Sequence, residues 1–246
     1  MNLFLLLVPN SRPSIRRNQK VEMAKTAIII GSTGLTGSQL LKTLLSSNVY
    51  EKVISFVRKE TKISHPKLVQ HVVDFADPES YEELIEGNDM FCCMGTTIKK
   101  AGTEEAFEKV DLAYPIQFAR VAAGRGVKQY SIISSLGANP KSNNFYLRTK
   151  GRCEDELRKL PFQSISVFRP SLLLGNRKEF RLGEKTIEFL MKIFSIFFIG
   201  KLKKYRAIDI KKVAYAMFRI AQENTVGYHV YESDTIAEIY SQKESL

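Results

Sequence analysis

The stretch IIIGSTGLTG, residues 28–37, changes character along its length. It begins with three β-branched isoleucines, which favour a strand, and continues into a turn with a glycine at every third position. The segment that follows, residues 39–45, places leucines at helical spacing. The sequence therefore predicts a β-strand that passes through a glycine-rich turn into an α-helix.

The three glycines of this turn have different structural uses. Gly31 permits a tight turn, Gly34 removes a side chain where phosphates would pass, and Gly37 lets the helix pack closely on the strand. Free N–H groups at the start of the helix attract anions. The spacing is G-x-x-G-x-x-G rather than the commoner G-x-G-x-x-G, but its place between a strand and a helix favours a dinucleotide pyrophosphate site. A purely structural turn is the alternative.

Strand and helix patterns alternate along the rest of the chain. Apolar runs predict further strands at residues 52–58, 68–75, 89–95, 129–135, 164–170 and 227–231. Helices are predicted at residues 35–45, 77–87, 104–123, 144–160, 183–197 and 209–222. Near-continuous runs of Ile, Val and Phe are typical of parallel strands that helices cover on both faces. The sequence thus predicts an α/β fold with a Rossmann-type doubly wound parallel sheet.

The length of 246 residues fits one domain. We expect residues 1–22 to form a disordered N-terminal extension. Either Met1 or Met23 could be the start, since strand-like sequence begins directly after Met23. Residues 23–246 are expected to form a single NAD(P)-binding Rossmann domain, with C-terminal substrate-binding elements from about residue 171.

The chain is basic, with a formal net charge of +11. Such an excess can attract phosphate-bearing ligands, nucleic acid or an anionic membrane, although a solvated surface also explains it. No zinc-ligand spacing or RNA-binding motif accompanies the charge, so we expect neither a nucleic-acid partner nor a metal. The three cysteines do not form a disulfide framework, which favours a reducing compartment and a cytoplasmic location.

A second apolar run, residues 186–200, precedes a lysine-rich segment that extends to residue 212. Glu188 and Lys192 interrupt this run, and it is shorter than the roughly 20 residues that a membrane-spanning helix needs. Residues 186–212 could instead hold a membrane surface or a protein partner. The alternative is a helix that lines the core or a pocket.

The end of the second predicted strand indicates which nucleotide binds. It reads Val57-Arg58-Lys59, and two cations there can neutralise the 2′-phosphate of NADPH. An NAD site usually carries an acidic residue at this point. Glu60 follows one residue late, so NAD is the alternative cofactor. Asp74 ends the third predicted strand, where it can bond adenine or simply cap the next helix.

Catalytic candidates follow the fifth predicted strand. Tyr146 and Lys150 share one face of a predicted helix, and Ser134 and Ser135 end the strand before it, at the sheet edge where ligands bind. A free tyrosine has a pKa near 10, and a nearby ammonium favours its phenolate. Tyr146 could then donate a proton to a carbonyl oxygen, Lys150 could bond the nicotinamide ribose, and Ser135, preferred over Ser134, could hold the substrate oxygen. An exposed tyrosine beside a solvated lysine is the alternative.

Seven segments together resemble a known superfamily. They are GSTGLTG, FCCMGTTIKKAG, VDLAYP, IISSLGA, NFYLRTKG, FRPSLLLGNR and RLGE, which lie between residues 24 and 240. This set resembles the short-chain dehydrogenase/reductase superfamily. More narrowly, it resembles the atypical branch of Tat-interacting protein homologues, with FCCMGTTIKKAG as its most specific segment.

The resemblance implies a set of cofactor contacts. Those on the pyrophosphate side are Thr33, Gly34, Leu35 and Thr36, and those at the 2′-phosphate are Arg58 and Lys59. Further contacts to the cofactor are Met94, Gly95, Tyr146, Lys150, Leu173 and Arg181. The superfamily's common Asn-Asn-Ala-Gly after the fourth strand is replaced by Cys-Met-Gly-Thr-Thr, so the resemblance leaves the proton relay and the substrate open.

Two functions of different classes follow from the sequence. The first is an NADPH-dependent reductase of a small-molecule carbonyl substrate, with Tyr146 as the acid. The second is an NADPH-binding regulatory or interaction protein with little or no catalysis. Sugar-nucleotide epimerisation would usually need a larger C-terminal domain. A homodimer could form through the predicted helices at residues 104–123 and 144–160.

Overall fold

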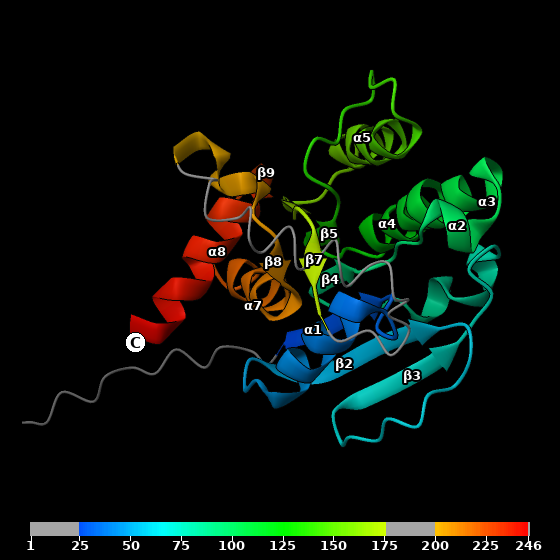
Figure 1. Cartoon of the computed structure of the whole chain (residues 1–246). Coiled ribbons are helices and arrows are strands. Elements are labelled where there is room, and N and C mark those ends of the chain that lie inside the picture. Colours follow the sequence, from blue (N-terminus) through cyan, green and yellow to red (C-terminus); the bar gives the residue numbers. More distant parts are fainter. Residues whose placement is uncertain (1–24, 176–199, 246) are drawn as a thin grey trace, which may run out of the picture.

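The computed structural model describes residues 25–175 and 200–245. These residues contain a seven-stranded sheet with the order β3-β2-β1-β4-β5-β6-β9 (Figure 1). The strands are β1 (Lys25–Ile30), β2 (Tyr50–Val57), β3 (Leu68–Val72), β4 (Asp89–Cys92), β5 (Gln129–Ile133), β6 (Ser164–Arg169) and β9 (Gly227–Glu232). Each neighbouring pair is parallel. This arrangement confirms the Rossmann-type fold expected from the sequence.

Helices cover both faces of the sheet (Figure 1). They are α1 (Leu35–Ser46), α2 (Ile98–Ala101), α3 (Glu104–Glu108), α4 (Tyr114–Gly124), α5 (Phe145–Arg158), α7 (Ile210–Ile220) and α8 (Ser233–Ser241). Helices α1 and α7 pack against each other over one face, and α4 and α5 lie over the other. The sheet is therefore the middle of three layers.

Strand β1 shows why its sequence is a continuous apolar run. Ile28 and Ile30 belong to the core beneath α4 and α5, whereas Ala27 and Ile29 belong to the core beneath α1 and α7. All four side chains are fully buried. Because successive residues of a strand point to opposite faces, a strand covered on both faces needs apolar residues at every position.

The chain order places a switch point between β1 and β4. From β1 the chain runs outward to β2 and β3, and then returns to the other side of β1 with β4. Helices after β1 and β4 therefore lie on opposite faces of the sheet, which leaves a crevice at the carboxyl ends of these two strands. Open α/β sheets bind ligands at such a point.

Some predicted helices differ from the structure. The helix expected at residues 77–87 is wrong: two 3₁₀ turns, Pro78–Ser80 and Glu82–Leu84, stand there. Tyr81 separates them with a φ of −138°, outside the helical range. The helix expected at residues 104–123 is present, but a π-helical turn, Lys109–Ala113, interrupts it between α3 and α4. The third strand ends at Val72, earlier than expected.

Several short elements were not expected. These are α2, α8, the 3₁₀ turns Gly200–Tyr205 and Gln242–Ser245, and the two-stranded pair β7 (Leu173–Leu174) and β8 (Ile208–Asp209). The predictions for residues 1–22 and for a helix at 183–197 fall outside the described residues. Among residues 25–175 and 200–245, no helix has the length and apolar character that crossing a membrane requires.

Candidate functional site

The glycine turn between β1 and α1 is packed too tightly for side chains. Gly31 has a φ of +77°, and a Cβ there would lie 2.5 Å from the carbonyl carbon of Cys93. A Cβ on Gly37 would lie 2.1 Å from the carbonyl oxygen of Gly31. Gly34 donates its N–H to that same oxygen at 3.0 Å. The turn therefore needs glycine at positions 31 and 37, as its sequence predicts.

Two adjoining hollows form one cleft at the carboxyl edge of the sheet. The hollow on the β2 side has a volume of about 160 Å³, and the hollow on the β5 side about 770 Å³. Both are lined by Thr33, Gly34, Cys93, Met94 and Gly95, which follow β1 and β4. We call the two hollows together the edge cleft. It crosses the switch point between β1 and β4.

The β2-side hollow has aromatic walls and a cation. Phe75 lies edge-on to Tyr114, with ring centroids 6.1 Å apart, and both line the hollow. Arg58, which directly follows β2, lines it as well and is exposed. The hydroxyls of Ser32 and Ser55, hydrogen-bonded at 2.7 Å, tie the glycine turn to β2. This hollow can take a flat ring and an anionic group.

Two residues predicted near this hollow lie elsewhere. Lys59 is exposed and is not among the residues that line the edge cleft. The carboxylate of Asp74 accepts a hydrogen bond from the N–H of Ala76 at 2.9 Å. The cap of the next helical turn, Pro78–Ser80, is Asp77, so the helix-capping use expected for Asp74 is wrong, and its bond to adenine stays a prediction. Phe75, its neighbour, is the residue that reaches the hollow.

The β5-side hollow brings Tyr146 and Lys150 together with an acid. Lys150 is 6% exposed, and its Nζ lies 2.7 Å from Oδ1 of Asp111, which is 1% exposed. Asp111 also accepts a hydrogen bond from the N–H of Thr96 at 2.8 Å. Burial disfavours the ammonium, but the Asp111 carboxylate outweighs burial and raises the pKa of Lys150 above its ordinary value. Lys150 is therefore a buried, charged lysine.

Asp111 is a site residue that the sequence reasoning missed. It belongs to VDLAYP, one of the segments that resemble a known family. Helical spacing gives no sign that Asp111 meets Lys150, because the two residues lie on different helical segments. An acid inside an otherwise apolar helix segment was the one local signal.

The structure distinguishes the two serines after β5. Ser134 lines the edge cleft, and its hydroxyl donates to the carboxylate of Glu154. Arg169 holds the same carboxylate through Nε, at 3.0 and 3.2 Å, and through Nη2. Ser135, the preferred candidate, is not among the lining residues, and its hydroxyl lies 3.4 Å from the carbonyl of Leu136. The structure thus brings Ser134 to the cleft and leaves Ser135 outside it.

Most other predicted cofactor contacts line the edge cleft. Those on the β5 side are Thr33, Gly34, Leu35, Thr36, Met94, Gly95 and Leu173. Gly37 lies beneath the turn, where it packs on Gly31. Arg181 falls outside the described residues. The contacts expected after β1, β4 and β6 are therefore gathered at one edge of the sheet.

The three cysteines are free, and two of them are buried. Burial raises the pKa of the Cys92 thiol to about 11 and also raises the pKa of the other two thiols. Thiols at such pKa values are neutral near pH 7 and are poor nucleophiles. Cys93 lines the edge cleft but offers no thiolate chemistry there.

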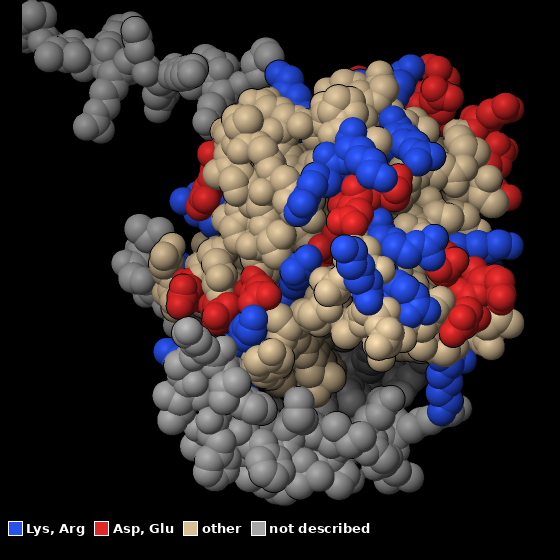
Figure 2. Space-filling model, turned by 90° about the horizontal axis from the view of Figure 1, so that it is seen from above, with Lys and Arg blue, Asp and Glu red and all other residues tan. Residues whose placement is uncertain are grey.

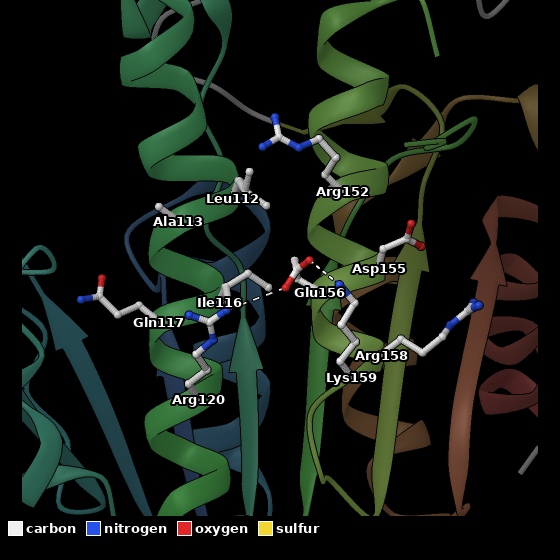
Figure 3. Close-up of a pocket in the computed structure, with 10 residues that line it drawn as sticks. All are labelled: Leu112, Ala113, Ile116, Gln117, Arg120, Arg152, Asp155, Glu156, Arg158 and Lys159. Atoms are coloured by element: carbon white, nitrogen blue, oxygen red, sulfur yellow. Dashed lines mark hydrogen bonds and ion pairs between the residues drawn. The ribbon is translucent and has the colours of Figure 1, made fainter. Parts of the chain in front are cut away.

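A separate groove lies between α4 and α5, away from the edge cleft (Figure 3). Its floor contains Leu112 and Ile116, and its rim carries charges of both signs. Glu156 pairs there with Arg120 at 3.8 Å and with Lys159 at 2.6 Å. Figure 2 likewise shows blue and red side chains interspersed over the face it presents. None of the residues predicted to be catalytic lines this groove.

The Rossmann-type sheet and the glycine turn at its switch point define an NAD(P)-binding protein with an oxidoreductase-like fold. A family model described as NAD(P)H-binding matches residues 31–191. The chain belongs to this NAD(P)H-binding family and is a homologue of the proteins named HTATIP2, or Tat-interacting protein, and FMP52.

Individual relatives support this placement. Protein HTATIP2 of Rattus norvegicus is 38% identical over 164 residues, which are 65% of this chain and 67% of the relative. Protein FMP52 of Debaryomyces hansenii is 38% identical over 159 residues, 63% of this chain and 69% of the relative. The Bordetella bronchiseptica enzyme WbmH, solved in complex with NAD⁺, has a TM-score of 0.65 at 17% identity, over 90% of this chain and 82% of that one. The last likeness shows the fold alone.

The relatives also correct one expectation. The sequence favoured a cytoplasmic location, on the basis of its few cysteines. Relatives from Scheffersomyces stipitis, Debaryomyces hansenii and Candida albicans carry names that mark them as mitochondrial. The cytoplasmic expectation is therefore wrong. Cysteine content separates oxidising from reducing surroundings, but it does not tell one reducing compartment from another.

Proposed function

We propose that this protein is an NADPH-dependent reductase of small carbonyl compounds, with Tyr146 as the acid. One observation carries the proposal. A single cleft joins the glycine turn, the cation Arg58 at one end, and the pair Tyr146 and Lys150 at the other. These are the parts that a nicotinamide-dependent reductase needs, in the order in which a dinucleotide would meet them.

The residues of the edge cleft fit NADPH. Gly31 and Gly34 line the β2-side hollow at the start of α1, where no side chain caps the helix, so the pyrophosphate can meet free N–H groups there. Arg58 is placed to pair with the 2′-phosphate, and the hollow beside Phe75 suits adenine. Lys150 would hold the ribose next to the nicotinamide. NADPH bound there supplies a hydride.

The protein's own residues would complete the reduction. Tyr146 donates a proton to the carbonyl oxygen as the carbonyl carbon is reduced. Lys150 holds the bound nucleotide next to Tyr146. Ile133 and Leu173 form an apolar part of the wall. Such a wall favours a substrate with an apolar body and lowers the water content beside the reacting carbon.

The reaction is tested with NADPH deuterated at the transferring position. Acetophenone and benzaldehyde serve as carbonyl probes, because their alcohol products keep the transferred deuterium on carbon, and the products are analysed by mass spectrometry. We expect deuterium in the alcohol from at least one probe. Tight NADPH binding without transfer to any probe would contradict the reductase proposal.

The cofactor preference is tested with Arg58→Glu, and Lys59→Glu is the matched control. Arg58 lines the cleft and Lys59 does not, although both carry the same charge. We expect Arg58→Glu to weaken NADPH by about tenfold or more and NADH far less, because a charged hydrogen bond contributes roughly 1.5–3 kcal/mol. Equal losses for both nucleotides would rule out the 2′-phosphate assignment.

A second function is favoured by the state of the two serines. The hydroxyl of Ser134 is engaged by Glu154, and Ser135 lies outside the lining of the cleft. Neither serine therefore offers a free hydroxyl donor to a substrate oxygen. This observation supports an NADPH-binding regulatory protein with little catalysis. The deuterium experiment separates the two functions, since a regulator binds NADPH without transferring hydride.

A second copy of the chain is the partner we propose for the groove between α4 and α5. Its apolar floor and its rim of both charges would suit a two-fold contact, in which each rim meets the opposite charges of the other (Figure 3). Sedimentation velocity over rising concentration tests this, and a monomer throughout would contradict it. A membrane or protein partner for residues 186–212 stays a prediction, because residues 186–199 lie outside the described ranges.

A further inference from the structure

The helical segment from Glu104 to Gly124 contains an unusual turn. Residues Lys109–Ala113 are π-helical, between α3 and α4. A π turn inserts one extra residue into a helix, rotates the side chains after it, and occurs often at functional sites. Asp111 lies in the middle of this turn and is 1% exposed. A carboxylate is costly to bury, so its place there needs partners.

Asp111 joins three elements. One carboxylate oxygen lies 2.7 Å from Nζ of Lys150 on α5, and the other accepts the N–H of Thr96 in the segment after β4. A Cβ added to Gly95 would lie 3.5 Å from Oδ1 of Asp111 and 3.9 Å from Nζ of Lys150. Gly95 therefore lies directly beside the ion pair, which itself lines the β5-side hollow.

The charged and titratable groups around Lys150 decide how strong an electrostatic field its ammonium exerts on its neighbours. They are Asp111 from the π turn, Tyr146 and Cys153 from α5, and Cys92 from β4. Burial raises the pKa of both thiols, so they are neutral near pH 7. The carboxylate of Asp111 is thus the group that balances the ammonium. A paired ammonium exerts a weaker field on a neighbouring phenol than an isolated one.

We propose that Asp111 is a positioning residue of the edge cleft. It holds the side chain of Lys150 in the cleft and offsets the positive charge of Lys150. Lys150 then acts by donating hydrogen bonds to the nucleotide, rather than by promoting the ionisation of Tyr146 with an unbalanced charge. Nζ has three donors, and the one that Asp111 takes leaves two for a ligand. The assignment of Lys150 to the nucleotide rests on the proposed function.

The charge balance is tested without any substrate. The absorbance of tyrosinate is measured against pH for the wild type and for Tyr146→Phe. The difference between the two curves is the signal of Tyr146. The same difference is taken in an Asp111→Asn background. We expect the signal to appear at a lower pH in that background, by about one pH unit or more, because the ammonium is no longer balanced. An unchanged or higher pH would overturn the proposal.

A second variant keeps the test decisive if Asp111→Asn does not fold. Asp111→Asn combined with Lys150→Met removes both charges, and replacing a whole buried ion pair is usually tolerated. We expect the Tyr146 signal at the same pH as in the wild type. A clear rise would show that Lys150 promotes ionisation of Tyr146 in the native protein, and that result would overturn the charge balance.

The positioning role is tested by NADPH affinity. We expect Asp111→Asn to weaken NADPH by about three- to tenfold, the size of one hydrogen bond. Asp77→Asn is the matched control, since Asp77 is exposed, does not line the edge cleft or the groove, and asparagine can keep its capping role. Equal affinities in the two variants would overturn the positioning role. If no carbonyl probe is reduced, the proposed function fails, while the titration still decides the charge balance.

Discussion

At the scale of single residues, the glycine turn depends on the space around it. Gly37 is the sharpest case, because a Cβ there would lie 2.1 Å from the carbonyl oxygen of Gly31. Backbone must move to relieve that contact, and the moved backbone is the part that would receive a pyrophosphate. The stability of this turn and its affinity for a nucleotide should therefore fall together.

We predict that Gly37→Ala lowers the free energy of unfolding by about 1–3 kcal/mol and abolishes tight NADPH binding. Gly124→Ala is the matched control, since a Cβ there meets nothing within 4 Å. The control should be neutral or stabilising, because alanine restricts the unfolded chain. Chemical denaturation and a nucleotide titration measure both effects. Equal stability of the two variants would contradict this account of the turn.

The triad of Ser134, Glu154 and Arg169 is the second residue-scale feature with a measurable consequence. Glu154 is 3% exposed and accepts from both partners. We predict that Glu154→Ala costs about 2–4 kcal/mol, somewhat less than a fully buried pair, because Arg169 retains some exposure. Glu83→Ala, which breaks an exposed pair with Arg125, should cost at most about 1 kcal/mol. Thermal unfolding measures the loss of stability in each variant. Similar losses in Glu154→Ala and Glu83→Ala would contradict this prediction.

At the scale of elements, the ion pair of Asp111 and Lys150 joins the π turn to α5. Since the folded-state pKa of Lys150 is raised, the pair stabilises the fold fully below the unfolded pKa of about 10.4. That contribution is lost as the pH rises through the higher folded-state pKa. The pair should therefore matter most near neutral pH and least in strong alkali.

We predict that Asp111→Asn lowers the free energy of unfolding by about 3 kcal/mol near pH 7, because it leaves a buried ammonium unpaired. Burial lowers the pKa of an unpaired Lys150, so the difference from the wild type should narrow as the pH rises through that lowered pKa and then through the wild-type one. Denaturation curves measured from neutral to alkaline pH give this dependence. A difference that stays constant with pH would show that the charge of Lys150 is not involved.

The elements also show what the sequence could predict. The turn at Gly31 and the apolar strands were predictable, because glycine spacing and continuous apolar runs are local signals. The π turn and the bond between Asp111 and Lys150 were not, because they depend on contacts between separate elements. Helix α8 was also missed, although Ile236, Ile239 and Tyr240 lie at helical spacing within it. The sequence also could not show which of Ser134 and Ser135 faces the cleft, because the side-chain directions of residues just past a strand are not fixed by the strand's pattern.

At the scale of the whole molecule, strand order brings distant residues to one edge. Arg58 follows β2, Gly95 follows β4 and Tyr146 lies in the first turn of the helix after β5, yet all three line the edge cleft. A parallel sheet achieves this because its strands all end at the same side. Basic and acidic side chains are interspersed on the face that Figure 2 shows, and the cleft, with Arg58 at one end, offers a place where a phosphate-bearing ligand fits.

The central claim is that Tyr146 is the acid of a reductase whose cofactor lies in this cleft. The most direct measurement compares Tyr146→Phe with Tyr215→Phe, a control because Tyr215 does not line the cleft. For both variants, NADPH affinity and the rate of NADPH oxidation with a reducible carbonyl probe are measured. We predict that both variants bind NADPH like the wild type and that Tyr146→Phe alone loses turnover, by about a hundredfold or more. Undiminished turnover in Tyr146→Phe would contradict the claim.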